Sequence, residues 1–174
     1  MKYIVLILIG ILASCSLSTF EQQREQINTI IIHYDILLNS IENTDVSSAG
    51  SNLKRYKQAL AYSKNKLSID KKPSLKTMTY LNDLKLMKRQ FKNAPNRKKS
   101  FKSNIKKNQE QLKNLLNDID NDIFTNEQLN AILVREEQAL NGISIQISEF
   151  QSAYKNYEVR FDSLYQLSQT FNYQ

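Results

Sequence analysis

Residues 129–171 read LNAILVREEQALNGISIQISEFQSAYKNYEVRFDSLYQLSQTF. Alternating steps of four and three from Leu129 reach apolar or aromatic residues along the whole stretch, with two polar exceptions, Glu136 and Ser168. A 3.5-residue period of this kind keeps one side of a long helix against neighbouring helices. The stretch predicts one long C-terminal helix over residues 126–171, and it indicates an all-α fold with coiled-coil character.

The rest of the chain agrees with an all-α fold. Of its 174 residues, those beyond residue 14 include only two glycines, Gly50 and Gly142, and two prolines, Pro73 and Pro95. The segments between them are rich in Leu, Ile, Lys, Gln and Glu at three- and four-residue spacing, which is the period of a helix rather than a strand. We therefore expect residues 20–174 to form one domain, an elongated antiparallel bundle of about five helices.

Local signals predict where these helices begin and end. Ser18-Thr19-Phe20-Glu21 and Thr125-Asn126-Glu127-Gln128 match the capping box of a helix start. Pro73 suits a first helical turn, whereas Ala94-Pro95-Asn96 predicts a break, because a proline pushes the preceding residue out of the helical region. The five expected helices run from 18 to a linker at 44–51, then over 52–67, 74–93, about 101–123 and 126–171.

The helical period also predicts which side chains face the core. In the first four helices these are Ile27, Ile30, Ile31, Tyr34, Leu37, Leu38, Ile41, Leu53, Tyr56, Leu60, Leu67, Leu81, Leu84, Met87, Phe91, Phe101, Ile105, Leu112, Leu115, Ile119 and Ile123.

The later half of the last helix carries a row of aromatic residues. These interaction-seam candidates are Phe150, Tyr154, Tyr157, Phe161 and Phe171. Large aromatics in one row are typical of both cores and interface anchors. Core is the first expectation, and the alternative is an exposed edge through which the chain associates with itself or with another protein.

The N-terminus has the layout of an export signal. Lys2 precedes an apolar run that ends in Leu12-Ala13-Ser14-Cys15, and this run is shorter than the roughly 20 residues of a spanning helix. The four residues resemble the lipobox of bacterial lipoproteins. The resemblance implies that residues 1–14 are a cleaved signal peptide and that Cys15 is acylated with fatty acids such as palmitate. Residues 15–19 would then be a short tether to a membrane.

The lipobox resemblance also implies a location. The protein would lie in a bacterial cell envelope, with Ser16 favouring the outer membrane and the leaflet left open. The competing interpretations are an uncleaved N-terminal anchor and an unmodified thiol at Cys15.

The middle of the chain is strongly basic. Residues 54–107 hold 18 lysines and arginines against Asp70 and Asp83, a net charge of +16, whereas 15–53 carry −4 and 108–174 carry −6. Either the acidic segments lie against the basic ones, or the basic block binds anionic envelope lipids or acidic glycans. Export makes nucleic acid a poor partner. The anion-binding candidates are Lys88, Arg89, Lys92, Arg97, Lys98, Lys99, Lys102, Lys106 and Lys107.

The sequence shows no enzyme motif. His33 is the only histidine, no glycine-rich phosphate loop or nucleophile elbow is present, and Asp118, Asp120 and Asp122 lack the glycine and glutamate of a calcium loop. We expect no catalytic site, no cofactor and no metal. The leading interpretation is a lipid-anchored helical scaffold or interaction protein, and the alternative is a binding module for anionic ligands.

Overall fold

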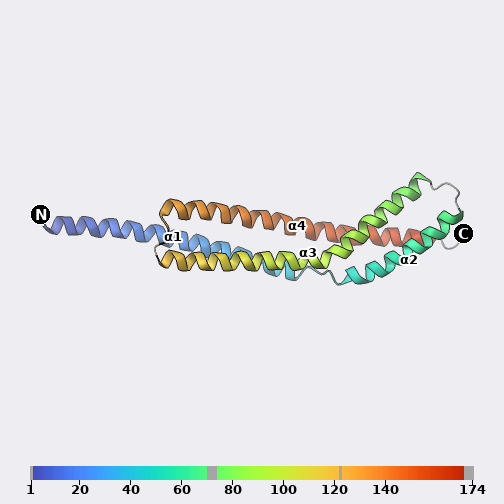
Figure 1. Cartoon of the computed structure of the whole chain (residues 1–174), viewed down its shortest axis with the longest axis horizontal. Coiled ribbons are helices and arrows are strands. Elements are labelled where there is room, and N and C mark those ends of the chain that lie inside the picture. The colour runs from blue at the N-terminus through green and yellow to red at the C-terminus, as the bar shows by residue number, and fades with distance from the viewer. Residues whose placement is uncertain (1, 70–73, 122, 171–174) are drawn as a thin grey trace. The chain divides into compact units, whose positions relative to one another are not determined.

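The structure is a computed structural model, and it describes residues 2–69, 74–121 and 123–170, with side chains from residue 20 onwards except at 65–69. Within these residues the chain is all-helical, with four helices packed together (Figure 1). Helix α1 spans Lys2–Glu42, α2 spans Ser48–Ile69, α3 spans Leu75–Asp120 and α4 spans Asn126–Thr170. The single long C-terminal helix is confirmed.

The predicted break at Ala94-Pro95-Asn96 is wrong, because α3 continues through Pro95. A proline inside a helix removes one backbone hydrogen bond and costs about 3 kcal/mol relative to alanine. The buried row of α3 nevertheless continues across it, since Phe91, Ala94 and Phe101 are all in the core, while Pro95 itself is exposed. Burial on both sides of the proline outweighs the local cost, so the third and fourth expected helices are one.

The other predicted helix ends have mixed outcomes. The second capping box is confirmed, because the Gln128 amide donates to the Thr125 hydroxyl at 3.3 Å and the Thr125 amide donates to Gln128 Oε1 at 3.0 Å. Ser74 caps α3 through the Thr77 amide at 3.2 Å. Helix α2 begins at Ser48, inside the expected linker. The predicted start at Ser18 is wrong, since α1 is already helical from Lys2.

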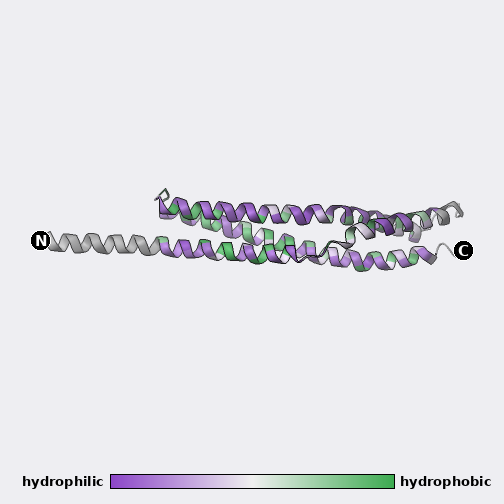
Figure 2. Ribbon diagram, turned by 90° about the horizontal axis from the view of Figure 1, so that it is seen from below, coloured by the Kyte–Doolittle hydropathy of each residue, from purple (hydrophilic) through white to green (hydrophobic). Residues whose placement is uncertain are grey.

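The chain divides into two compact units. Unit 1 comprises Met1–Ser40 and Lys102–Gln146, and unit 2 comprises Ile41–Phe101 and Ile147–Gln174. Helices α3 and α4 each contribute one part to each unit. The ribbons carry both hydrophilic and hydrophobic residues along their lengths, as amphipathic helices do (Figure 2).

In unit 1, α3 runs antiparallel to α1. Arg24 of α1 pairs with Asp120, whereas Tyr34, further along α1, accepts a hydrogen bond of 3.0 Å from the amide of Asn108. Next to the first of these contacts, Gln23 donates to Asn130 of α4 at 2.7 Å. The apolar core of unit 1 contains Ile27, Ile30, Tyr34, Ile105, Leu112, Leu115, Ile119, Leu129 and Leu133.

In unit 2, α2 and α4 run parallel in a constant register. The Arg55–Asp162 ion pair measures 2.6 Å and the hydrogen bond from the Tyr165 hydroxyl to Gln58 measures 2.9 Å, each joining residues 107 positions apart. Ser48 bonds Tyr154 at 2.9 Å with a separation of 106. The core of unit 2 contains Ile41, Ala49, Tyr56, Ala59, Tyr80, Leu84, Met87, Phe91, Ala94, Phe101, Ile147, Phe150, Tyr154 and Phe161.

Most of the expected core residues are buried, and the exceptions are local. Ile123 is 58% exposed, so its placement in the core was wrong; it follows the end of α3 at Asp120. In α2 the buried positions include the small residues Ala49, Ala59 and Ser63 as well as Tyr56. Of the core residues expected in the first four helices, Ile31, Leu37, Leu38, Leu53, Leu60 and Leu81 are half-buried, and Leu67 lies outside the described side chains.

Gly142 is not needed for a close helix crossing. A Cβ atom placed on it would meet nothing within 4 Å. The position is a tolerated glycine inside α4.

Candidate anion-binding surface

Charge is divided unequally between the two units. Unit 2 contains 17 basic and 7 acidic residues, a net charge of +10, whereas unit 1 contains 7 basic and 10 acidic residues, a net charge of −3. The basic block predicted from the sequence therefore belongs mainly to unit 2. A surface of one sign attracts ligands of the opposite sign.

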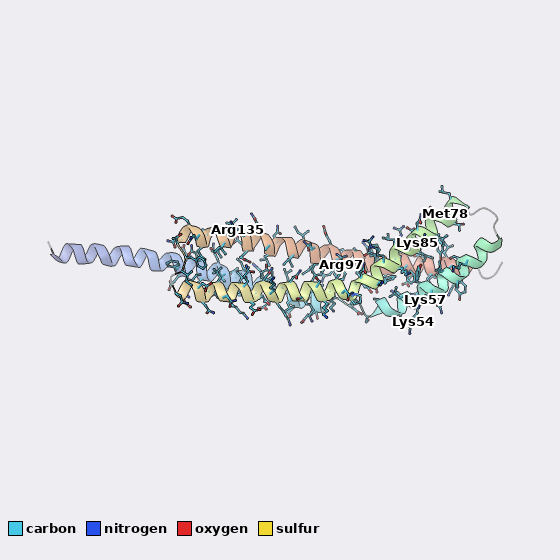
Figure 3. The ribbon with its side chains drawn as sticks, in the orientation of Figure 1. Lys54, Lys57, Met78, Lys85, Arg97 and Arg135 are labelled. Atoms are coloured by element: carbon cyan, nitrogen blue, oxygen red, sulfur yellow. The ribbon has the colours of Figure 1, made fainter. Side chains whose placement is uncertain are left out.

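Most basic side chains of unit 2 are exposed. Lys54 and Lys57 lie on α2 and Lys85 lies on α3 (Figure 3). Among the described residues, the side chains of these three lysines form no ion pair and no hydrogen bond. The same holds for the side chains of Arg89, Lys92 and Lys99 on α3. Their charges are available to an external anion.

Among the described residues, ion pairs inside the chain account for little of this charge. Arg55 pairs with Asp162 of α4 at 2.6 Å, as expected if acidic segments lie against basic ones. The 2.7 Å pair between Arg160 and Asp83 has the opposite sense, because its base lies in the acidic C-terminal segment and its acid in the basic block. Neither pair involves the exposed lysines of α2 and α3.

Two of the predicted anion-binding residues serve the fold instead. The guanidinium carbon of Arg97 lies 4.9 Å from the ring centroid of Phe150, within the range of a cation–π contact. The Lys98 ammonium donates to the backbone carbonyls of Glu42 at 2.8 Å and Thr44 at 2.7 Å. Lysine at the end of a helix satisfies carbonyls that lack helical partners, so Lys98 is the cap of α1.

The environment of Lys98 also affects a nearby carboxylate. The pKa of Asp45 is lowered, chiefly because its carboxylate accepts hydrogen bonds from the Ser47 side chain and backbone, with a smaller contribution from the Lys98 charge. Lys88 has a partial role in packing, since its ammonium lies 5.4 Å from the Tyr56 ring centroid.

The remaining candidates in unit 2 share one face of α3. Arg89 follows Lys85 by four residues, Lys92 follows Arg89 by three, and Lys99 follows Lys92 by seven. These steps keep side chains on the same side of a helix. We call these four residues the basic row of α3. Lys85 was not among the residues predicted, although its spacing from Arg89 was visible in the sequence.

The three candidates from 102 onwards belong to unit 1, where the surroundings are acidic. Lys106 and Lys107 are exposed and Lys102 is half-buried. Lys107 lines a groove of about 460 Å³ together with Glu110, Asp118 and Glu136. Carboxylates on this groove disfavour an anionic ligand there.

The aromatic candidates of α4 form the core of unit 2. Phe150, Tyr154 and Phe161 are 3%, 4% and 0% exposed, and Tyr157 is half-buried. This burial agrees with the first expectation, that these residues belong to the core. Phe171 lies outside the described residues, and so does the side chain of Cys15.

Buried polar residues are a feature that we did not single out as functional. Glu136 is 8% exposed and accepts a 2.9 Å hydrogen bond from the Gln111 amide. Burial raises the pKa of its carboxyl group above the ordinary value of 4.5. In unit 2, burial likewise raises the pKa of Tyr80, against hydrogen bonds with Ser63 and Ser168 that lower it. In the sequence, the sign of both sites was a polar residue in the otherwise apolar row of the last helix, Glu136 at the first site and Ser168 at the second.

A cluster of metal ligands and a membrane-spanning helix were both sought in the described residues. His33 is exposed and lines a groove of about 530 Å³ beside Glu25 and Glu137. No three His, Cys, Asp or Glu side chains of the described part are placed to hold a metal ion. Within the same part, none of the helices has a stretch long and apolar enough to cross a bilayer.

Comparison with known proteins assigns no family: no family model, curated protein or solved structure matches this chain.

Proposed function

We propose that this chain is a non-enzymatic, lipid-anchored protein of a bacterial envelope whose unit 2 binds anionic ligands. The observation that carries the proposal is the net charge of +10 on unit 2, together with the basic row of α3, whose side chains form no ion pair in the described structure. The anchor is Cys15, through the lipobox resemblance.

The scaffold interpretation has less support. Association through the aromatic row of α4 would require an exposed row, and Phe150, Tyr154 and Phe161 are buried by the chain's own helices. Anionic lipid head groups and acidic glycans remain as ligands that an envelope protein would meet. Each lysine or arginine near such a surface contributes about 1 kcal/mol.

The test removes the basic row. A variant with Lys85, Arg89, Lys92 and Lys99 changed to glutamine is compared with a control that changes Lys106, Lys107, Lys113 and Arg135 of unit 1 to glutamine. Both variants lose four positive charges from exposed positions. Both are made with Cys15→Ser, so that acyl chains do not drive the binding.

Binding to anionic vesicles and to a sulfated polysaccharide is measured at low and high salt. We expect the unit 2 variant to bind at least about 100-fold more weakly, since four contributions of about 1 kcal/mol are lost. The control should bind almost as well as the parent, and parental binding should weaken as salt rises. No binding by the parent at low salt, or equal losses in both variants, would contradict the proposal.

A further inference from the structure

We infer that the outer face of α3 between Leu75 and Lys92 binds the surface of an anionic lipid bilayer. The inference rests on the proposed function and deepens it, because it names the ligand of unit 2. It also adds an apolar component to a surface that we have so far described by charge alone.

The first observation is a set of exposed apolar side chains on one face. Leu75, Met78 and Leu86 are 84%, 46% and 39% exposed. Met78 follows Leu75 by three residues, and Leu86 follows Met78 by eight. The exposed Asn82 lies between them on the same side, four residues from each of Met78 and Leu86. Such steps align side chains along one side of a helix. The opposite side of α3 holds Tyr80, Leu84, Met87 and Phe91, which are buried in unit 2.

The second observation is the charge around this apolar set. On a helix with 3.6 residues per turn, Lys85, Arg89 and Lys92 lie on the same outward side as Met78, in the turns that follow it. Figure 3 labels Met78 and Lys85 on this part of the helix. The one acidic residue between Leu75 and Lys92 is Asp83, which is paired with Arg160. The outer face is thus apolar and basic, with its nearby acid neutralised.

This combination fits a bilayer surface better than other anions. At the boundary of head groups and acyl chains, leucine and methionine leave water while lysine and arginine extend to the phosphates. A sulfated glycan would pair with the bases but offers no apolar layer for Leu75, Met78 and Leu86. A second copy of unit 2 is disfavoured, because each copy carries a net charge of +10.

The sharpest test uses a fluorescent reporter. The chain contains no tryptophan, so the emission of a Met78→Trp variant reports that position alone. The matched control is Val134→Trp, at a residue of α4 in unit 1 that is 54% exposed. Both variants carry Cys15→Ser, and both are mixed with phosphatidylglycerol vesicles and with phosphatidylcholine vesicles.

We expect a blue shift for Met78→Trp on phosphatidylglycerol vesicles, because the ring leaves water, and none on phosphatidylcholine. The control should not shift on either lipid. Equal emission of Met78→Trp with and without anionic vesicles overturns the inference, and so does an equal shift in the control.

A second variant separates this inference from the proposed function. Met78→Gln with Leu86→Gln keeps every charge and changes only exposed side chains. We expect roughly tenfold weaker binding to phosphatidylglycerol vesicles, unchanged binding to a sulfated polysaccharide, and unchanged helicity by circular dichroism.

If the double variant binds these vesicles as well as the parent does, the apolar contact is absent and the inference fails. If the parent binds the polysaccharide but not the vesicles, the inference also fails while the proposed function stands. If the parent binds neither at low salt, both fail.

Discussion

The ring of Phe161 on α4 meets the ring of Phe91 on α3 edge to face, with 5.1 Å between the ring centroids and 77° between the ring planes. Both rings are fully buried. Phe91 makes a second edge contact with Tyr154, at 6.1 Å. Pairs in this geometry contribute beyond the area that they bury, so the three rings hold α3 and α4 together in unit 2.

Phe161→Ala should therefore destabilise the protein strongly. Removing a buried phenylalanine side chain costs about 3 to 5 kcal/mol, because transfer energy is lost and a cavity remains. Thermal unfolding followed by circular dichroism measures the loss. Val159→Ala, at a neighbouring residue that is 64% exposed, is the control and should leave the melting temperature nearly unchanged. Equal melting of Phe161→Ala and the parent would show that the ring is not buried.

Pro95→Ala should stabilise the protein. Because α3 is continuous and Pro95 is exposed, alanine restores one backbone hydrogen bond without disturbing the core, a gain of up to about 3 kcal/mol. Chemical denaturation measures the free energy of unfolding. A clear loss of stability in Pro95→Ala would mean that the chain leaves the helical conformation at this position after all.

Glu136→Gln should stabilise unit 1 at neutral pH. Burial raises the pKa of the Glu136 carboxyl group, so the folded state favours the neutral acid. The groove around it also holds Lys107, Glu110 and Asp118. Below the ordinary pKa the acid is neutral in both folded and unfolded states. As the pH rises through the raised pKa, ionisation costs the folded state more than the unfolded state, and this part of the stability is lost.

The Glu136→Gln substitution removes that pH dependence while keeping an acceptor for the Gln111 amide. The difference in melting temperature between variant and parent should be small at pH 4 and larger at pH 7. A variant that is less stable than the parent at pH 7 would show that the carboxylate has a stabilising partner in the fold.

Cys15→Ser tests the anchor. If Leu12 to Cys15 act as a lipobox, serine provides no sulfur for acylation. The variant should then leave the membrane fraction or retain its signal peptide. Radiolabelled palmitate and cell fractionation measure both effects. A Cys15→Ser protein that is still processed and labelled like the parent would rule out the lipoprotein assignment.

Much of the helical fold was predictable, because the information is local. The capping box at Thr125 and the 3.5-residue row through Ile147 and Phe161 depend only on neighbouring residues, and both are found in the structure. The row also contains Glu136, a polar exception that the structure shows to be buried. The candidate site was predicted less well, since Arg97 and Lys98 look like any other bases until their distant partners are known.

The sequence by itself determined that this protein is helical, that the aromatic residues Phe150, Tyr154, Tyr157 and Phe161 share one side of a long helix, and that its positive charge is concentrated in residues 54–107. The tertiary structure decided that α3 continues through Pro95. It also decided that the side chains of Lys85, Arg89, Lys92 and Lys99 are exposed and unpaired in the described structure. The physical reason is that helical periodicity arises within a few residues. Whether a helix tolerates a proline, and whether a lysine side chain has a partner in the fold, depends on contacts between segments far apart in the chain.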